Sequence, residues 1–335
     1  MKNILSIQLA IFYFLLTGSV FAVSENDLGK IYFSEVVPLL NEKSKSDFFI
    51  GKENKKIHYF HYESANAKGV LVISPGQAEP ALKYAELVYD LKDAGYDIFV
   101  IDHRGQGASE RLLEDPVKSH VEKFQYYVDD LATFVKTIVH PENYPNSILL
   151  GHSMGGAIAS GLSALHGKLF KHIVLSAPMI QIETNPYPEV LALGLAHVLS
   201  AAGKSISYAP KQKPYNPDEK FSDQNTTHSW LRFRLEQELW KIYPQLPLGG
   251  TTVNWVKTSL DWTLKIRKVK NVFRVPTTLF QATNDKWVKS RGQNQICAAS
   301  PSVCKITVVQ GSRHEILFES DEYRNLILTH LKSLL

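Results

Sequence analysis

The stretch that decides the fold is Ile148-Leu149-Leu150-Gly151-His152-Ser153-Met154-Gly155-Gly156, an apolar run that ends in Gly-His-Ser-Met-Gly and passes into small residues. This is the Gly-x-Ser-x-Gly elbow, in which a strand turns sharply into a helix and exposes a serine at its tip. Gly151 and Gly155 flank Ser153 where a Cβ would collide with the neighbouring strand or helix. The motif alone also arises by chance as a plain turn. The apolar strand before it and the close-packed helix after it favour a nucleophile at Ser153.

Strands and helices alternate on both sides of this turn. An apolar run typical of a strand buried on both faces occurs at residues 70–74, and a second buried strand is predicted at 98–101. Further strands are predicted at 172–176, 276–282 and 305–309. Helical spacing of apolar residues occurs at 84–91, 124–138 and 323–335. Two β-rich runs within 48–62 predict a hairpin. The alternation predicts an α/β fold with a mostly parallel, doubly wound sheet. The last helix is predicted to face inward through Leu326, Ile327, Leu331 and Leu334.

Two polar residues in late loops complete the chemistry that Ser153 needs. A serine hydroxyl requires an imidazole to take its proton and a carboxylate to fix the tautomer of that imidazole. Around this kind of elbow the acid and the histidine follow the serine in that order, after later strands. Asp285 follows the strand at 276–282, and His314 follows the strand at 305–309, 29 residues further on (314 − 285). We therefore predict Ser153, Asp285 and His314 as the catalytic residues.

The other candidates for these roles are weaker. His152, His103, His120 and His172 are predicted to be structural. Asp261 falls inside a helical pattern, and Glu315 is too close to His314 in sequence to serve as its acid. The spacing of the histidines does not indicate a metal site, so no metal is predicted.

The tetrahedral oxyanion of an acyl transfer needs two backbone donors. One is the N–H of the residue after the nucleophile, here Met154. The other comes from the loop after an early strand, which is Pro75-Gly76-Gln77 in this chain, and we assign it to the N–H of Gln77. Because this donor is a backbone group, a side-chain change at Gln77 should cost less activity than one at Ser153.

The alternation breaks between Met179 and Asn271, where strand patterns vanish and three helical patterns appear. Four of the five tryptophans lie in this insertion: Trp230, Trp240, Trp255 and Trp262. Either these aromatics form the core of an added helical layer, or the insertion is a cap over the active site with some side chains lining an acyl-chain pocket. The predicted organisation is a leader at 1–22, the first part of the core at 23–178, a helical cap at 179–271 and the second part of the core at 272–335.

Length and composition place only wide limits on the fold and the function. The 335 residues suffice for one large α/β domain with an inserted subdomain, and 44% apolar with 21% charged residues is ordinary for a globular protein. The net charge of +4, from 37 basic and 33 acidic residues, is too slight and dispersed to indicate nucleic-acid binding.

The N-terminus has the order of a secretory signal peptide. Lys2 precedes an apolar run at residues 9–16, and small residues lead to Val20-Phe21-Ala22. The run is far shorter than the roughly 20 residues that span a bilayer, so cleavage after Ala22 is favoured over an uncleaved anchor. The predicted location is exported, either periplasmic or secreted, with Val23 as the first mature residue.

The only two cysteines, Cys297 and Cys304, lie seven apart. In an oxidising compartment such a pair is expected to form a local disulfide, which stabilises by about 2–3 kcal/mol for so short a loop. A redox-active or metal role is not expected, because Cys-x-x-Cys spacing and a third ligand are both missing.

Further motifs extend the pattern beyond the elbow, and with them the sequence resembles the α/β-hydrolases related to monoacylglycerol lipase, among them the bacterial lysophospholipases. The resemblance runs from about Val70 to His314. It is carried by Lys83-Tyr84-Ala85-Glu86-Leu87, Ile101-Asp102-His103-Arg104-Gly105-Gln106-Gly107, Tyr127-Val128-Asp129-Asp130-Leu131 and His152-Ser153-Met154-Gly155-Gly156. It implies cleavage of the single acyl ester of a lysophospholipid or monoacylglycerol by the same three residues, with no cofactor.

The chain departs from this family in two places. Monoacylglycerol lipases usually carry His-Gly at the early oxyanion loop, whereas this chain has Pro75-Gly76-Gln77, which is closer to lysophospholipases. The leader and the cysteine pair suggest an exported form, so the compartment is inferred from this sequence and not from the family.

Three functions remain open at this point. The first is a lysophospholipase, the second a monoacylglycerol lipase or general carboxylesterase with the same catalytic residues, and the third a silent binding protein, which is disfavoured because all three catalytic candidates are present. Basic residues of the insertion either attract a phosphate head group or form a solvated face: Lys204, Lys211, Lys213, Arg232 and Arg234. Peripheral membrane contact through the cap is a further expectation. The oligomeric state is not predicted.

Overall fold

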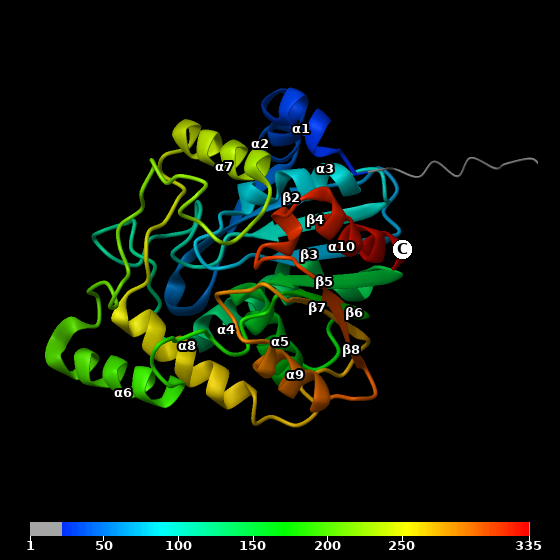
Figure 1. The fold of residues 1–335 in the computed structure, drawn as a ribbon. Coiled ribbons are helices and arrows are strands. Elements are labelled where there is room, and N and C mark those ends of the chain that lie inside the picture. The colour runs from blue at the N-terminus through cyan, green and yellow to red at the C-terminus, as the bar shows by residue number, and fades with distance from the viewer. Residues whose placement is uncertain (1–21, 335) are drawn as a thin grey trace, which may run out of the picture.

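A sheet of eight strands runs through the protein, in the order β1-β2-β4-β3-β5-β6-β7-β8 (Figure 1). The structure is a computed structural model that describes residues 22–334, so the predicted leader lies outside the described residues except for Ala22. Strands β3 to β8 pair in parallel, while β1 and β2 form an antiparallel hairpin that also pairs antiparallel with β4. The predicted α/β fold with a mostly parallel sheet is confirmed. The strands are β1 (Lys45–Ile50), β2 (Lys56–Tyr62), β3 (Gly69–Ser74), β4 (Tyr96–Ile101), β5 (Asn146–His152), β6 (His172–Ser176), β7 (Thr277–Ala282) and β8 (Cys304–Val309).

Helices cover both faces of the sheet, which explains why its central strands are apolar throughout. Along β3, Val70 and Val72 belong to one buried cluster while Leu71 and Ile73 belong to the other, because successive side chains of a strand point to opposite faces. The first cluster is packed against α4 (Gln125–Phe134), α5 (Met154–His166) and α9 (Ser290–Ala298). The second is packed against α1 (Glu25–Ile31), α2 (Val37–Asn41), α3 (Ala85–Leu91) and α10 (Asp321–Ser333).

One prediction for the last helix is wrong. Ile327, Leu328 and Leu331 on α10 are buried, but Leu326 is 47% exposed. The apolar stripe is therefore centred on Ile327 and Leu331, and Leu326 lies a hundred-degree step around the helix from it, on the solvent side.

The insertion lies between β6 and β7 and forms α6 (Glu189–Leu199), α7 (Trp230–Ile242) and α8 (Val253–Ile266). It occupies one side of the molecule, with α7 beside α1 and α6 beside α8 (Figure 1). Trp240 and Trp255 are buried and belong to the two main cores, whereas Trp230 is exposed. The tryptophans therefore do not make a separate core of the insertion. Within the described part of the chain, no helix combines the length and the apolar character needed to cross a membrane.

Helix α6 presents most of its apolar side chains to solvent. Val190, Leu191 and Val198 are 70%, 62% and 66% exposed, and Ala196 is the residue of this helix that is buried. A contiguous exposed apolar surface of this kind is unusual for a monomeric protein and commonly marks an interaction site.

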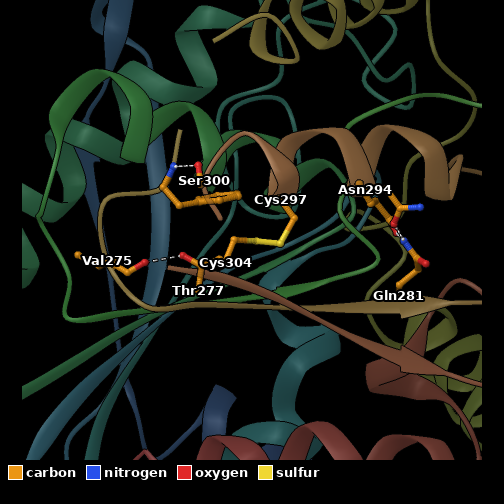
Figure 2. Close-up of a disulfide and its surroundings, with 9 residues drawn as sticks. Val275, Thr277, Gln281, Asn294, Cys297, Ser300 and Cys304 are labelled. Atoms are coloured by element: carbon orange, nitrogen blue, oxygen red, sulfur yellow. Dashed lines mark hydrogen bonds between the residues drawn. A yellow bond between two sulfur atoms is a disulfide. The ribbon is translucent and has the colours of Figure 1, made fainter. Parts of the chain in front are cut away.

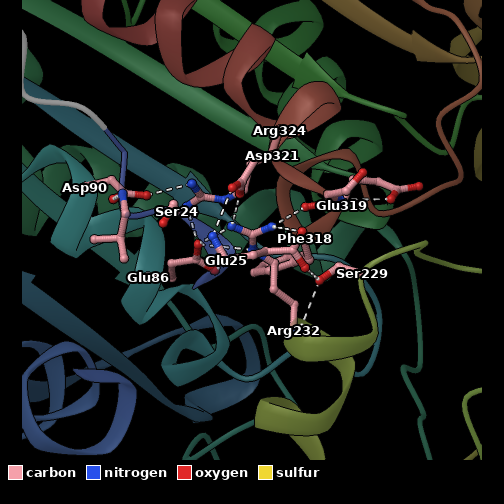
Figure 3. A network of polar contacts seen from close by, with 12 residues as sticks. Ser24, Glu25, Glu86, Asp90, Ser229, Arg232, Phe318, Glu319, Asp321 and Arg324 are labelled. Atoms are coloured by element: carbon pink, nitrogen blue, oxygen red, sulfur yellow. Dashed lines mark hydrogen bonds and ion pairs between the residues drawn. The ribbon is translucent and has the colours of Figure 1, made fainter. Parts of the chain in front are cut away.

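A buried ionic network joins α7 to the helices that cover the sheet (Figure 3). The guanidinium of Arg232 donates to Glu86 on α3 at 2.8 Å and to Asp321 at the start of α10 at 2.7 Å. It also donates to the carbonyl of Glu319 at 2.6 Å. Arg232 is therefore neither a head-group residue nor part of a solvated face, and both interpretations were wrong for it. The carboxylates that pair with it in the interior lie far away in the sequence.

Cys297, near the end of α9, and Cys304, the first residue of β8, form a disulfide with Cα atoms 5.2 Å apart (Figure 2). The bond joins a helix to the edge strand of the sheet. Ser300, between them, accepts a hydrogen bond from the N–H of Phe273, so the short connection is also tied to the segment before β7.

Candidate active site

The elbow has the geometry that its glycines predict. Strand β5 ends at His152 and α5 begins at Met154, with Ser153 between them at φ 49° and ψ −116°. Such a conformation costs a non-glycine residue about 1–3 kcal/mol and persists only where its surroundings impose it. A Cβ on Gly155 would lie 1.9 Å from the carbonyl oxygen of Ser74, and one on Gly151 would lie 2.7 Å from that of Gly155. The expected collisions are confirmed, so the absence of a Cβ at Gly151 and Gly155 is what permits the close approach of α5 to β3 and β5.

The structure brings the three predicted side chains together at the carboxyl ends of parallel strands. Nε2 of His314 lies 2.8 Å from Oγ of Ser153, and Nδ1 of His314 lies 2.7 Å from Oδ2 of Asp285. The other carboxylate oxygen of Asp285 accepts the N–H groups of Trp287 at 2.7 Å and Val288 at 3.1 Å. Asp285 is thereby fixed by its own loop and left with one oxygen for the imidazole.

The charges of this pair stabilise each other. Burial disfavours both ions, but the His314 imidazole holds the pKa of Asp285 below its usual range, with help from the N–H groups of Trp287 and Val288. Burial likewise opposes charging of His314, yet the attraction and hydrogen bond of Asp285 outweigh it and raise the pKa of His314. A histidine with a raised pKa is a stronger base toward the Ser153 hydroxyl.

Two backbone N–H groups have no hydrogen-bond acceptor among residues 22–334. Among the described residues, nothing accepts a hydrogen bond from the N–H of Met154, at the start of α5, or from that of Gln77, in the loop after β3. A helix N-terminus carries partial positive charge, which favours an anion beside Met154. Both groups are those predicted as oxyanion donors.

The other histidines of the region are structural. Nδ1 of His152 lies 3.1 Å from the carbonyl oxygen of Ser176, and burial lowers the pKa of His152 to about 4. His103 is bonded to Ser74, and burial lowers its pKa to about 3. Both rings are therefore neutral near neutral pH. No group of three or more potential metal ligands occurs in residues 22–334.

A buried ionic cluster beside the site was missed from the sequence. Nζ of Lys83 lies 3.1 Å from Glu79, 3.3 Å from Glu236 on α7 and 3.1 Å from Glu315. The spacing of Glu79 and Lys83 is the one available signal, but charged pairs four residues apart usually lie on solvated helix faces. Here the pair is buried, so the sequence could not distinguish it from an ordinary surface pair.

The cluster holds more carboxylates than cations, so its members titrate differently. Burial opposes ionisation of Glu79, but Lys83, His152, the Tyr84 hydroxyl and the Gly76 N–H lower its pKa to about 2. Burial and the neighbouring carboxylates raise the pKa of Glu315 to about 7, although Lys83 opposes this. Glu79 therefore ionises more readily than Glu315.

Comparison with known proteins places this geometry in context. A family model described as serine aminopeptidase, S33, matches residues 65–321. Lysophospholipase L2 of Escherichia coli strain K12 is 34% identical over 291 residues, which cover 84% of each chain. A probable lysophospholipase L2 of Haemophilus influenzae is 30% identical and covers 88% of this chain and 93% of its own. Monoglyceride lipase of Mus musculus is 26% identical, over 81% and 83% of the two chains.

Solved structures share the fold at low sequence identity. A soluble variant of monoglyceride lipase from Saccharomyces cerevisiae, in complex with a substrate analogue, superposes with a TM-score of 0.67 at 18% identity and covers 87% of this chain and 95% of that one. A monoacylglycerol lipase from Paleococcus ferrophilus gives 0.62 at 17% identity, over 83% and 99%. These likenesses show the α/β-hydrolase fold.

Proposed function

Because this chain belongs to the α/β-hydrolase family described as serine aminopeptidase S33, and is a carboxylic ester hydrolase related to bacterial lysophospholipases and monoacylglycerol lipases, we propose that it is a lysophospholipase. Its broader class is a serine hydrolase acting on lipid esters. In the proposal, Ser153, His314 and Asp285 cleave the single acyl ester of a lysophospholipid through an acyl-enzyme.

The proposed reaction has two halves. Oγ of Ser153 attacks the ester carbonyl carbon while His314 Nε2 takes the hydroxyl proton. The N–H groups of Gln77 and Met154 stabilise the oxyanion, and each such donor typically contributes about 10²–10³-fold in rate. The tetrahedral species expels the glycerophosphodiester alkoxide, which takes the proton from His314. A water molecule then gives its proton to His314 and attacks the acyl-enzyme, and fatty acid is released as Ser153 regains its proton.

One observation carries this proposal: the unbroken hydrogen-bonded chain from Ser153 through His314 to Asp285. In the described part of the chain, the N–H groups of Met154 and Gln77 are also without an acceptor. The geometry supports acyl transfer, and the choice of lysophospholipid rests on relatives that carry that name. The alternative, a monoacylglycerol lipase or general carboxylesterase, uses the same residues and is favoured by the relatives named monoglyceride lipase.

Export is part of the proposal, and the folded N-terminus supports the predicted cleavage position. Val23, the residue after the predicted site, donates its backbone N–H to Oδ1 of buried Asp90 at 2.7 Å. Ser24 immediately afterwards caps α1 by accepting the N–H of Asp27. Cleavage after Ala22 would therefore keep both the Val23 contact to Asp90 and the capped start of α1 in the mature chain.

We also propose that the protein contacts membranes through α6. Its exposed Val190, Leu191 and Val198 provide an apolar surface, and exposed Lys204 and Lys211 follow it in the chain. An apolar helical face flanked by cations is suited to the interface of an anionic bilayer. Such contact would place the insertion beside the lipids that are the proposed substrates.

The test is a side-by-side assay of the mature protein on lysophosphatidylcholine, monoacylglycerol, diacyl phospholipid, a short-chain ester and an aminoacyl anilide. Ser153→Ala is the matched control. The proposal expects the highest kcat/KM on lysophosphatidylcholine and none in the control. Preference for monoacylglycerol would establish the alternative, turnover of only the short ester would exclude the lipid assignment, and cleavage of the anilide would indicate a peptidase.

A further inference from the structure

The loop that carries Gln77 is held by two buried side chains from opposite sides. Oε1 of Gln106 accepts the N–H of Ala78 at 2.9 Å, and Nε2 of Gln106 donates to the carbonyl of Gly76 at 3.0 Å. Oε2 of Glu79 accepts the N–H of Gly76 at 2.6 Å. The N–H groups on either side of Gln77 are therefore both occupied, and its own is left unpaired among the described residues.

We propose that Gln106 and Glu79 are positioning residues for the oxyanion loop. By occupying the N–H groups of Ala78 and Gly76, they leave the N–H of Gln77 as the loop's donor and fix its direction toward the substrate oxygen. Neither side chain touches the reacting atoms. Their role rests on the proposed function, because it presumes that Ser153 is the nucleophile.

The loop needs such support because its backbone is strained. Ala78 has φ 61°, in the left-handed region that residues with a Cβ rarely adopt. A Cβ on Gly76 would lie 2.6 Å from Oε2 of Glu79, so the carboxylate and the loop backbone are in close contact. Strained conformations persist where surrounding interactions impose them, and here those interactions come from Gln106 and Glu79.

The chemistry at position 106 requires an amide. Ala78 presents a donor and Gly76 an acceptor, and a carboxamide is the neutral side chain that offers both complementary groups at one end. Gln106 is buried, and its own backbone is fixed in a turn, with its N–H donating to His103 at 2.9 Å and its carbonyl accepting Ser109 at 3.0 Å. The side chain of Gln106 thus ties the loop after β3 to the turn after β4, whose own backbone hydrogen bonds hold it in place.

Glu79 connects the same loop to the base. Its Oε2 also accepts the Tyr84 hydroxyl at 2.7 Å, and its Oε1 lies 3.1 Å from Nζ of Lys83. Lys83 in turn lies 3.1 Å from Glu315, the residue after His314. One buried ammonium thus joins the loop of the oxyanion donor to the loop of the histidine.

The experiment compares Gln106→Met with wild type. Methionine keeps the length and volume but forms neither hydrogen bond. We expect kcat to fall about 10- to 100-fold with KM little changed, somewhat less than deletion of an oxyanion donor. Affinity for an acyl trifluoromethyl ketone, whose adduct with Ser153 carries an oxyanion, should fall by the same factor. Affinity for the fatty-acid product, which lacks a tetrahedral oxyanion, should stay unchanged.

Gln293→Met is the matched control. Gln293 is also buried, with Oε1 accepting from Gln281 at 3.0 Å and Nε2 donating to the carbonyl of Pro178 at 3.2 Å. The Gln293→Met variant should lose about as much thermal stability as Gln106→Met. Its ratio of ketone affinity to product affinity should stay that of wild type. If Gln106→Met does not fold, Glu79→Gln, which keeps an acceptor for Gly76 but weakens the link to Lys83, should show the same correlated loss in smaller measure.

Normal kcat in folded Gln106→Met, or a loss of kcat without loss of ketone affinity, would overturn the proposal. An equal change in the Gln293→Met control would also overturn it, because the effect would then follow stability alone. Failure of the proposed function is a different result, since it would appear as turnover by Ser153→Ala. Failure of the positioning role alone would appear as normal kcat or normal ketone affinity in Gln106→Met while Ser153→Ala stays inactive.

Discussion

Nε2 of His314 lies 2.8 Å from Oγ of Ser153, although 161 residues separate them in the chain. The contact exists because β5 and β8 end at the same edge of one parallel sheet. The second nitrogen of His314 is bonded to Asp285, so the ring is held in the orientation that directs Nε2 at the hydroxyl. For Nε2 to accept the proton of the Ser153 hydroxyl, His314 must be neutral and carry its own proton on Nδ1.

Asp285→Asn should keep the fold but lose most activity. An asparagine amide facing Nδ1 stabilises the wrong tautomer of His314, and the analogous change in a serine protease lowers kcat by about 10⁴-fold. The measurement is kcat on the preferred ester, together with thermal unfolding to show that the variant is folded. Activity near the wild-type value would exclude Asp285 as the partner of His314.

Glu315→Gln should move the acid limb of the kcat/KM profile to lower pH. Activity requires neutral His314 and so appears as pH rises through its pKa, which nearby carboxylates raise. Where Glu315 is ionised, its charge stabilises the imidazolium, so removing that charge lowers the pKa of His314 and activity persists to lower pH. Because burial also raises the pKa of Glu315, it carries this charge over only part of the limb, and the displacement should be small. Glu236→Gln is the control. Glu236 also pairs with Lys83, but it is not next to His314 in the chain. An unmoved limb, or one displaced to higher pH, would contradict this assignment.

Cleavage after Ala22 should create a stabilising ion pair. The α-ammonium of Val23 would face buried Asp90, whose other oxygen lies 2.6 Å from Arg324. Asp90→Asn should therefore cost more stability in protein that begins at Val23 than in protein that retains Ala22. A coupling of about 0.5–3 kcal/mol is expected from a double-mutant cycle in urea. Additive effects of the two changes would exclude the ion pair, and N-terminal sequencing of exported protein checks the cleavage position.

Replacing Leu191 and Val198 together by serine should weaken binding to phospholipid vesicles. Each apolar side chain that leaves water contributes about 1.5–3 kcal/mol to the free energy of vesicle binding. Replacing both should therefore lower vesicle affinity by at least about tenfold. Turnover of a soluble short-chain ester should be unchanged. Leu165→Ser is the control, because Leu165 is 56% exposed on α5, outside the insertion. Equal vesicle binding by the double variant and the control would remove α6 as the membrane contact.

The features that could be predicted from sequence are those encoded within a few neighbouring residues. Residues 70–73 predict a doubly buried strand because all four are apolar, and the structure divides them between two cores. The glycines around Ser153 predict the close packing of the elbow because only their backbone fits there. The order of Ser153, Asp285 and His314 follows from their loops after successive strands, and the structure brings the three together.

The remaining features depend on contacts between distant segments. Arg232 is charged and lies in a helix, so the sequence alone leaves it on the surface, yet Glu86, 146 residues away, pairs with it in the interior. Gln106 lies in a turn rich in glycine, and its partners Gly76 and Ala78 are 30 and 28 residues earlier. The apolar pattern of α6 indicates a helix but does not indicate which surface, if any, covers it.

The most direct test of the central claim is reaction of the mature protein with an alkyl fluorophosphonate, followed by peptide mass spectrometry. The hydroxyl of Ser153 lies 2.8 Å from Nε2 of His314, and the N–H groups of Gln77 and Met154 have no acceptor among the described residues. We therefore predict one phosphonyl group per chain, located on Ser153, with loss of ester turnover in proportion to labelling. Ser153→Ala should remain unlabelled and inactive. Labelling at another residue, or full turnover after complete modification of Ser153, would contradict the account.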